Sequence, residues 1–566
     1  MPAMAVAEAG ESSLLVSTIV EPETLLEDSS TPPDDALGGL SGNWRIAAVA
    51  VLVVVIAAGV VLRFWTRSAL WLDEALTVDI ARLPLHSLHA ALRQDGAPPL
   101  YYVLLHFWMK VFGGSNLGVR SLSGVISVAT LPVAWVAGRR FGGRSFAWMT
   151  VLLVASAPFA IYYGTEARMY SLVMLLTACG YIALDRAVRA PRPGNLIAVA
   201  VVTAALLYTQ YWAVYLLATV AVWLLWQGLR QGDPAYRTGA RRSFGALVVG
   251  GIAFVPWVPT FFFQTRHTGT PWAAPANFAA TINAVTGFTD NQATLSAAGS
   301  NQGRLLAVLY LLLAFLGLFG VARDHWHVDL DIRTRRRGRP IAFVVAVTLG
   351  IAVAGGLLAG SGFSDRYAAV VFIPFLVLVA LGATTLADAR LRSLILLVAA
   401  VSGLAVGVQN ITTQRTQAQS VAAVLAKSGR PGDVVAYCPD QLGPAVYRLT
   451  GPGRFVQITF PRSSVPGLID WIDYKKAVQD ASTGSFARHV LRLASTHRIW
   501  MVWAPDYQGY GTRCEQIVGD LEVNHSVTNR VLARPAHYYE PMNLTELTPV
   551  TAAPLSQATA ASAASG

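Results

Sequence analysis

The chain has 566 residues, of which 54% are hydrophobic and only 13% are charged, and its formal net charge is +11. Several apolar runs approach the roughly 20 residues that a helix needs to cross a bilayer, so the composition excludes an ordinary soluble protein and predicts a polytopic membrane protein. The basic residues stand in short loops between these runs, as the positive-inside rule expects, which argues against nucleic-acid binding.

The N-terminal 43 residues read as an acidic tail. They contain eight Asp and Glu residues and no Lys or Arg, and they are rich in Ser, Thr and Pro. This composition predicts a disordered cytoplasmic tail over residues 1–43. The first apolar run, residues 46–62, follows Arg45 and should lead out of the cytoplasm.

Two adjacent carboxylates, Asp73 and Glu74, follow this first span almost immediately. Trp65 and Trp71 place them at the level of the lipid headgroups. They could simply cap the next helix, because carboxylates favour a helix N-terminus. Alternatively, one of them acts as a general base, since burial at the interface raises the pKa of a carboxyl group.

The segment after the acidic pair predicts two helices that lie on the membrane surface. Residues 75–93 have the apolar spacing of an amphipathic helix. Residues 100–112 form an apolar run that is too short to span comfortably. We therefore expect juxtamembrane helices within residues 64–121, and this choice fixes the direction of every later span.

Ten further spans follow in this register, and each inner loop is rich in arginine. The predicted spans cover residues 122–137, 147–163, 170–184, 196–211, 214–225, 244–263, 305–321, 341–358, 368–386 and 394–408. The transmembrane domain should thus occupy residues 44–409 with about eleven helices in the plasma membrane, and its N-terminus should be cytoplasmic.

The composition changes from Asn410 onward and predicts an extracytoplasmic α/β domain over residues 410–545. Residues 418–427 and 490–494 have helical patterns, and residues 433–437 and 498–503 resemble buried strands. The domain should end near Pro541, and residues 546–566 should be disordered. Cys438 and Cys514 could form a disulfide if the domain is extracytoplasmic.

Glu166 and Arg168 fall on the same predicted membrane face as Asp73. An ion pair that fixes the turn between two spans would explain them. In the other interpretation, Glu166 assists Asp73 while the neighbouring tyrosines line a sugar site.

Arg366 opens a late span at its outer end, against the positive-inside rule. It could pair with Asp365, or its planar guanidinium could bind a lipid phosphate. His267, in a long external loop, is a weaker candidate, and the histidines show no metal-binding spacing such as HExxH.

The chain carries, in this order, one span, the acidic pair, the run Pro98-Pro99-Leu100-Tyr101-Tyr102 and a later Arg-Tyr pair. This arrangement resembles the GT-C superfamily of membrane glycosyltransferases. It is most similar to the branch of the protein O-mannosyltransferases and the aminoarabinose transferase that acts on lipid A. Two positions differ: Tyr170 stands where such enzymes often have a further acid, and Asp95-Gly96-Ala97 replaces a lysine often found before the Pro-Pro pair.

The resemblance implies that Asp73 is the catalytic carboxylate, that the Pro-Pro run lines the donor site and that Arg366 contacts the donor phosphate. The predicted catalytic residues are Asp73, Glu74 and Glu166, and the predicted substrate-binding residues are Arg366, Tyr367, Pro99, Tyr101, Tyr102, Arg168, Tyr170 and His267.

The expected reaction moves a mannose- or arabinose-type sugar from a polyprenyl-phosphate donor to a hydroxyl group of an envelope glycan, lipoglycan or exported protein. No cofactor is predicted, and dependence on a divalent metal stays open. A lipid transporter or flippase is the first alternative, but the chain shows no internal repeat. A non-catalytic envelope-assembly scaffold is the second.

Overall fold

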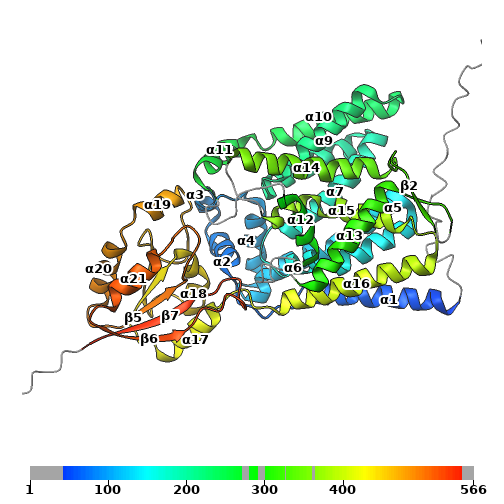
Figure 1. Cartoon of the computed structure of the whole chain (residues 1–566). Helices are drawn as coiled ribbons and strands as arrows, with labels where there is room; N and C mark the ends of the chain where they lie inside the picture. The colour runs from blue at the N-terminus through cyan, green and yellow to red at the C-terminus, as the bar shows by residue number, and fades with distance from the viewer. Residues whose placement is uncertain (1–41, 270–278, 291–299, 325–326, 360–363, 551–566) are drawn as a thin grey trace, which may run out of the picture.

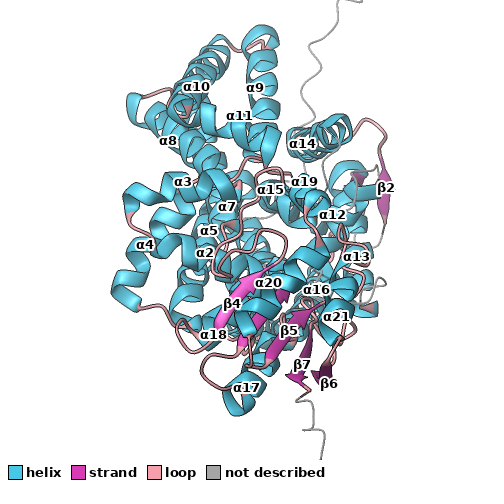
Figure 2. Ribbon diagram, turned by 90° about the vertical axis from the view of Figure 1, so that its left-hand side faces the viewer, coloured by secondary structure: helices cyan, strands magenta, loops and turns pink. Residues whose placement is uncertain are grey.

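A helical bundle and a smaller α/β domain at one of its ends make up the computed structural model (Figure 1). The structure describes residues 42–269, 279–290, 300–324, 327–359 and 364–550. The predicted fold class, a polytopic helical membrane protein with a C-terminal α/β domain, is confirmed. Figure 2 looks onto the α/β domain with the bundle behind it.

The bundle contains most of the helices. They are α1 (Asn43–Leu62), α5 (Asn116–Ser156), α6 (Pro158–Gly164), α7 (Tyr170–Arg189), α8 (Pro193–Thr209), α9 (Ala213–Arg230), α10 (Pro234–Ile252), η1 (Val255–Trp257), α11 (Val258–His267), α12 (Ala279–Asp290), α13 (Asn301–Phe319), α14 (Gly338–Ala359), η2 (Asp365–Ala368), α15 (Ala369–Ala383) and α16 (Ala389–Thr412). A short antiparallel hairpin, β1 (Gly320–Ala322) and β2 (Val328–Leu330), connects α13 to α14.

Within the described ranges, nine helical segments are long and apolar enough to cross a membrane. The expected number of about eleven is not confirmed by this count. Helix α5 covers two of the predicted spans and is interrupted at Gly142 and Gly143, where Gly143 has a φ of 83° that favours glycine. The predicted span 196–211 corresponds to α8, which has only 17 residues.

Close helix packing in the bundle depends on small residues. Helix α15 lies at the centre and is almost entirely buried. A Cβ atom at its Gly382 would lie 1.7 Å from the backbone oxygen of Leu313 in α13, so only glycine permits this crossing. A Cβ at Gly239 of α10 would likewise lie 1.9 Å from the backbone oxygen of Val188 in α7.

Three short helices follow α1: α2 (Leu72–Arg82), α3 (Leu85–Asp95) and α4 (Leu100–Phe112). Helix α4 has the predicted bounds. The single helix expected over residues 75–93 is wrong, because the chain breaks before Pro84. Proline disfavours the helical conformation of the preceding residue, and Leu83 is accordingly extended.

The C-terminal domain is a five-stranded sheet between two layers of helices. The strands are β3 (Val434–Cys438), β4 (Val456–Thr459), β5 (Ile499–Trp503), β6 (His525–Val531) and β7 (Asn543–Pro549), in the order β4-β3-β5-β7-β6. Helices α17 (Ala418–Ser428) and α18 (Gly443–Thr450) pack on one face, while α19 (Tyr474–Asp480), α20 (Thr483–Ala494) and α21 (Arg513–Glu522) pack on the other; η3 (Asp440–Leu442) leads into α18. The first three strands are parallel, and β7 is antiparallel to both its neighbours.

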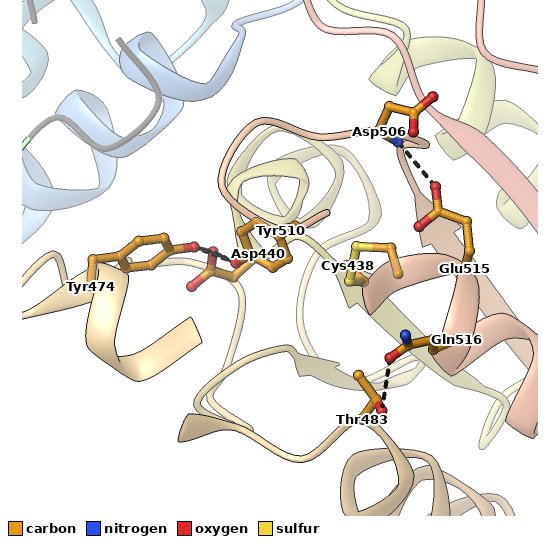
Figure 3. The surroundings of a disulfide bond; sticks show 9 residues. Cys438, Asp440, Tyr474, Thr483, Asp506, Tyr510, Glu515 and Gln516 are labelled. Atoms are coloured by element: carbon orange, nitrogen blue, oxygen red, sulfur yellow. Dashed lines mark hydrogen bonds between the residues drawn. A yellow bond between two sulfur atoms is a disulfide. The ribbon is translucent and has the colours of Figure 1, made fainter. Parts of the chain in front are cut away.

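The domain extends further than expected. Strand β7 lies between β5 and β6 and runs to Pro549, past the predicted ends at 541 and 545. Its sequence, NLTELTP, contains few apolar residues, so it lacks a strong strand signal. Cys438, at the end of β3, forms a disulfide with Cys514 of α21, as the sequence allowed (Figure 3).

Candidate active site

Asp73 and Arg366 lie 293 positions apart in the chain and meet at the end of the bundle next to the C-terminal domain. Asp73 stands in the first turn of α2, and Arg366 stands in η2, at the start of α15. Nη1 of Arg366 lies 2.8 Å from Oδ2 of Asp73, and Nη2 of Arg168 lies 3.8 Å from the same oxygen. The Asp73 side chain is 17% exposed, so a bound molecule could reach it.

Glu74 faces the protein interior and has a different environment. Its carboxylate accepts hydrogen bonds from Nε and Nη2 of Arg120, at 2.7 and 2.5 Å, and from the backbone N–H of Ala167 at 3.0 Å. Arg415 lies 3.5 Å away. Burial raises the pKa of Glu74, but the two arginines outweigh this and hold the pKa below its ordinary value. These contacts engage both oxygens of the Glu74 carboxylate, which is typical of a residue that positions its neighbours.

Glu166, between α6 and α7, is buried beside the same cluster. Its Oε1 accepts a hydrogen bond from Nε1 of Trp71 at 3.2 Å, while its Oε2 has no hydrogen-bond partner among the described residues. Burial raises the pKa of Glu166 to about 7. A carboxyl group with this pKa can either accept or donate a proton near neutral pH.

The Pro-Pro run connects to the cluster through one of its tyrosines. Pro99 directly precedes α4. Tyr102 donates a hydrogen bond to Asp95 at 2.7 Å, and Nη1 of Arg168 donates to the Tyr102 hydroxyl at 3.4 Å. Tyr101 contacts Ser123 of α5 instead.

Three other predicted residues have different surroundings. The Tyr170 hydroxyl is buried, interacts electrostatically with both Arg168 and Arg366, and has no hydrogen-bond partner among the described residues. The ring of Tyr367 packs against Trp212, at 5.5 Å between centroids. His267 does not join the cluster, because it pairs with Asp473 of the C-terminal domain at 3.0 Å.

Several residues of this site were not predicted from the sequence. Arg120 and Arg415 bind Glu74, and Arg415 also donates to the backbone and hydroxyl oxygens of Thr165. Tyr539 packs its ring against Trp71, at 5.0 Å between centroids. Arg120 carries the signal that singled out Arg366, since both lie at the predicted outer end of a span.

The C-terminal domain supplies part of this cluster. Glu540 follows Tyr539, and its backbone pairs with that of residues 415–417 next to Arg415. Burial raises the pKa of the Glu540 carboxyl group to about 8. No group of three His, Cys, Asp or Glu side chains in the described ranges could hold a metal ion.

Comparison with known proteins gives one family match. Residues 96–259 match the family described as dolichyl-phosphate-mannose-protein mannosyltransferase. The matched range includes the Pro-Pro run and Glu166 but neither Asp73 nor Arg366. No curated protein matches the chain in sequence.

The structure is similar to several solved structures. The crystal structure of ArnT from Cupriavidus metallidurans bound to undecaprenyl phosphate has a TM-score of 0.51 and 13% identity, covering 89% of this chain and 98% of that one. Its apo state has a TM-score of 0.49 and 13% identity over 89% and 97% of the two chains. The Archaeoglobus fulgidus oligosaccharyltransferase with a tethered acceptor peptide has a TM-score of 0.47 and 10% identity over 88% and 74%. At 13% identity, the likeness to ArnT establishes a shared fold.

Proposed function

We propose that the chain is a membrane glycosyltransferase of the GT-C superfamily, and that it transfers a sugar from a polyprenyl-phosphate donor to an acceptor hydroxyl group. The family model describes a lipid-phosphate-mannose transferase, and the structure of ArnT contains undecaprenyl phosphate, which supports a donor of this class. The sugar is of the mannose or arabinose type. The acceptor is an envelope glycan, a lipoglycan or an exported protein, reached on the extracytoplasmic face of the plasma membrane.

The observation that carries this proposal is the contact between Asp73 and Arg366. A polyprenyl tail stays in lipid, so its phosphate lies at the membrane surface, at the level of the span ends. Arg366 binds this phosphate and stabilises the charge that develops as it leaves. Asp73 accepts the proton of the acceptor hydroxyl, whose oxygen attacks the anomeric carbon as the bond to the phosphate oxygen breaks. The configuration at that carbon inverts.

Unused hydrogen-bond donors beside Asp73 support an anion site. Nε of Arg168, Nε of Arg366 and the hydroxyl of Tyr170 are buried, and none has a hydrogen-bond partner in the part of the chain that the structure describes. Leaving buried donors unpaired costs free energy, and a phosphate group supplies several acceptor oxygens. The two arginines also give the site the positive charge that a phosphate requires.

In this proposal Glu74 is a positioning residue rather than a base. Arg120 and Arg415 occupy both its oxygens, so it holds the first turn of α2 against the bundle. Glu166 is close enough to influence Asp73 electrostatically, and its Oε2 has no hydrogen-bond partner in the described ranges, so it orients the acceptor or assists the base.

The test uses the full-length protein in lipid vesicles, with radiolabelled polyprenyl-phosphate mannose or arabinose and a membrane extract as acceptor. Asp73→Asn should lower transfer by about 10²–10⁴-fold, because a general base contributes that much. Arg366→Ala should abolish transfer, and it should in addition weaken retention of the labelled donor. Asp79→Asn, on the same helix but paired with Arg82, is the matched control and should stay active. Near-normal transfer by Asp73→Asn would reject the assignment of the base.

A further inference from the structure

A large cavity lies far from the candidate active site. It has a volume of about 1410 Å³ and lies between α1, α5 and α16. In Figure 1 these helices extend away from the C-terminal domain. The lining residues belong to the N-terminal parts of α1 and α16 and to the part of α5 around its break at Gly142 and Gly143. Its size exceeds the roughly 300–1,000 Å³ of ordinary small-molecule sites.

The cavity has a basic rim. Its lining includes five arginines from three separate parts of the chain: Arg45, Arg139, Arg144, Arg390 and Arg392. No Asp or Glu is among the lining residues. Such a concentration of positive charge, without carboxylates in the same wall, favours an anionic occupant.

Apart from Ser145 and Ser393, the rest of the lining is apolar. Helix α1 contributes Leu52 and Ile56, helix α5 contributes Met149 and Leu152, and helix α16 contributes Leu397. Helix α1 is largely exposed along its length, so its apolar side chains face surrounding lipid or this cavity. A basic rim above an apolar wall matches a phosphate headgroup attached to hydrocarbon chains.

We propose that this cavity binds an anionic phospholipid of the cytoplasmic leaflet. Its phosphate lies among the arginines, and its acyl chains lie along α1, α5 and α16. The three arginine-bearing segments are all predicted inner loops, and basic pockets between spans on the cytoplasmic side suit lipid headgroups. The site is independent of the proposed transfer chemistry, since it lies at the opposite end of the bundle from Asp73.

The experiment measures lipid retention by the purified full-length protein. Native mass spectrometry follows titration with phosphatidylglycerol or phosphatidylcholine. The cavity variant replaces three exposed lining arginines (Arg139→Gln, Arg144→Gln and Arg390→Gln). A charge-matched control replaces three exposed arginines of other predicted inner loops that do not line the cavity (Arg230→Gln, Arg242→Gln and Arg336→Gln).

The wild type and the control should retain phosphatidylglycerol in preference to phosphatidylcholine. Each arginine near an anionic headgroup adds about a fivefold gain in affinity, so the cavity variant should bind phosphatidylglycerol on the order of 100-fold more weakly. If the triple substitution prevents folding, Ala48→Trp provides a second test. It fills the apolar part of the cavity, keeps every arginine and should also reduce retention.

Three results would overturn the proposal. Equal loss in the cavity variant and the control would mean that the surface attracts anionic lipid without a site. Displacement of the lipid by soluble glycerol phosphate would mean that the cavity binds a free phosphate. Unchanged retention by a folded Ala48→Trp variant would mean that the lipid does not occupy the cavity.

Discussion

Replacing Glu74 with glutamine should destabilise the protein, because its carboxylate lies at the centre of a buried charge cluster. Glu74 is fully buried, and the side chains of Arg120 and Arg415 are only 3% and 2% exposed. The amide would keep one acceptor oxygen for the N–H of Ala167 or for Arg120. Its NH₂ group, however, would face the donors of both arginines.

The expected cost follows from the burial of these charges. Breaking a buried ion pair by removing one partner costs about 3–5 kcal/mol, because the remaining charge is left without compensation. A second substitution, Arg120→Met, should return part of this loss, since the double variant removes the unpaired charge together with its partner. Asp480→Asn is the exposed control, because Asp480 pairs with Lys476 in solvent and should leave the melting temperature unchanged.

The assay is thermal unfolding in detergent, followed by tryptophan fluorescence, together with sugar transfer measured well below the melting temperature. Glu74→Gln should lower the melting temperature by several degrees and lose activity in parallel with folded protein. A variant as stable as the wild type that has no transfer activity would refute this reasoning. Glu74 would then act in the chemistry itself, as the sequence analysis expected.

Three further predictions concern other parts of the chain. Burial raises the pKa of Glu540 from its ordinary value of 4.5 to about 8 in the folded protein, so between these pH values the unfolded state binds fewer protons. The stability of the protein should therefore fall as pH rises through this window, by at most about 5 kcal/mol. Glu540→Gln should flatten the dependence of the melting temperature on pH. Cys514→Ser removes the disulfide between Cys438 and Cys514, which are 76 residues apart in the chain. This should destabilise the C-terminal domain by about 4 kcal/mol, measured by unfolding the domain with and without reductant. Gly382→Ala should reduce the yield of folded protein, because its Cβ would overlap the backbone of α13, whereas Gly350→Ala meets no neighbour within 4 Å and should be tolerated.

Membrane topology explains why the sequence could bring Asp73 and Arg366 together. Residues at the ends of spans can lie at only two faces, so counting spans is enough to place both on one face. The count requires that residues 100–112 form a helix that does not cross the membrane; helix α4 has these bounds and packs against α2.

Counting spans does not place residues that follow the last span. Arg415 and Tyr539 belong to the C-terminal domain or its junction, and no periodicity shows where a soluble domain docks. Their places depend on tertiary contacts, such as the pairing of Glu540 with residues 415–417. The same limit applies to His267, because its partner Asp473 also comes from that domain.

The two adjacent acids divide into different roles because they stand on one helix. Successive residues of an α-helix point about 100° apart, so Asp73 and Glu74 cannot face the same environment. Glu74 points inward, where Arg120 and Arg415 fix the first turn of α2 to the bundle and to the C-terminal domain. That attachment leaves Asp73 partly exposed beside Arg366. In the proposed mechanism, the acidic pair therefore combines an anchor, Glu74, with a reactive carboxylate, Asp73, and neither residue could replace the other.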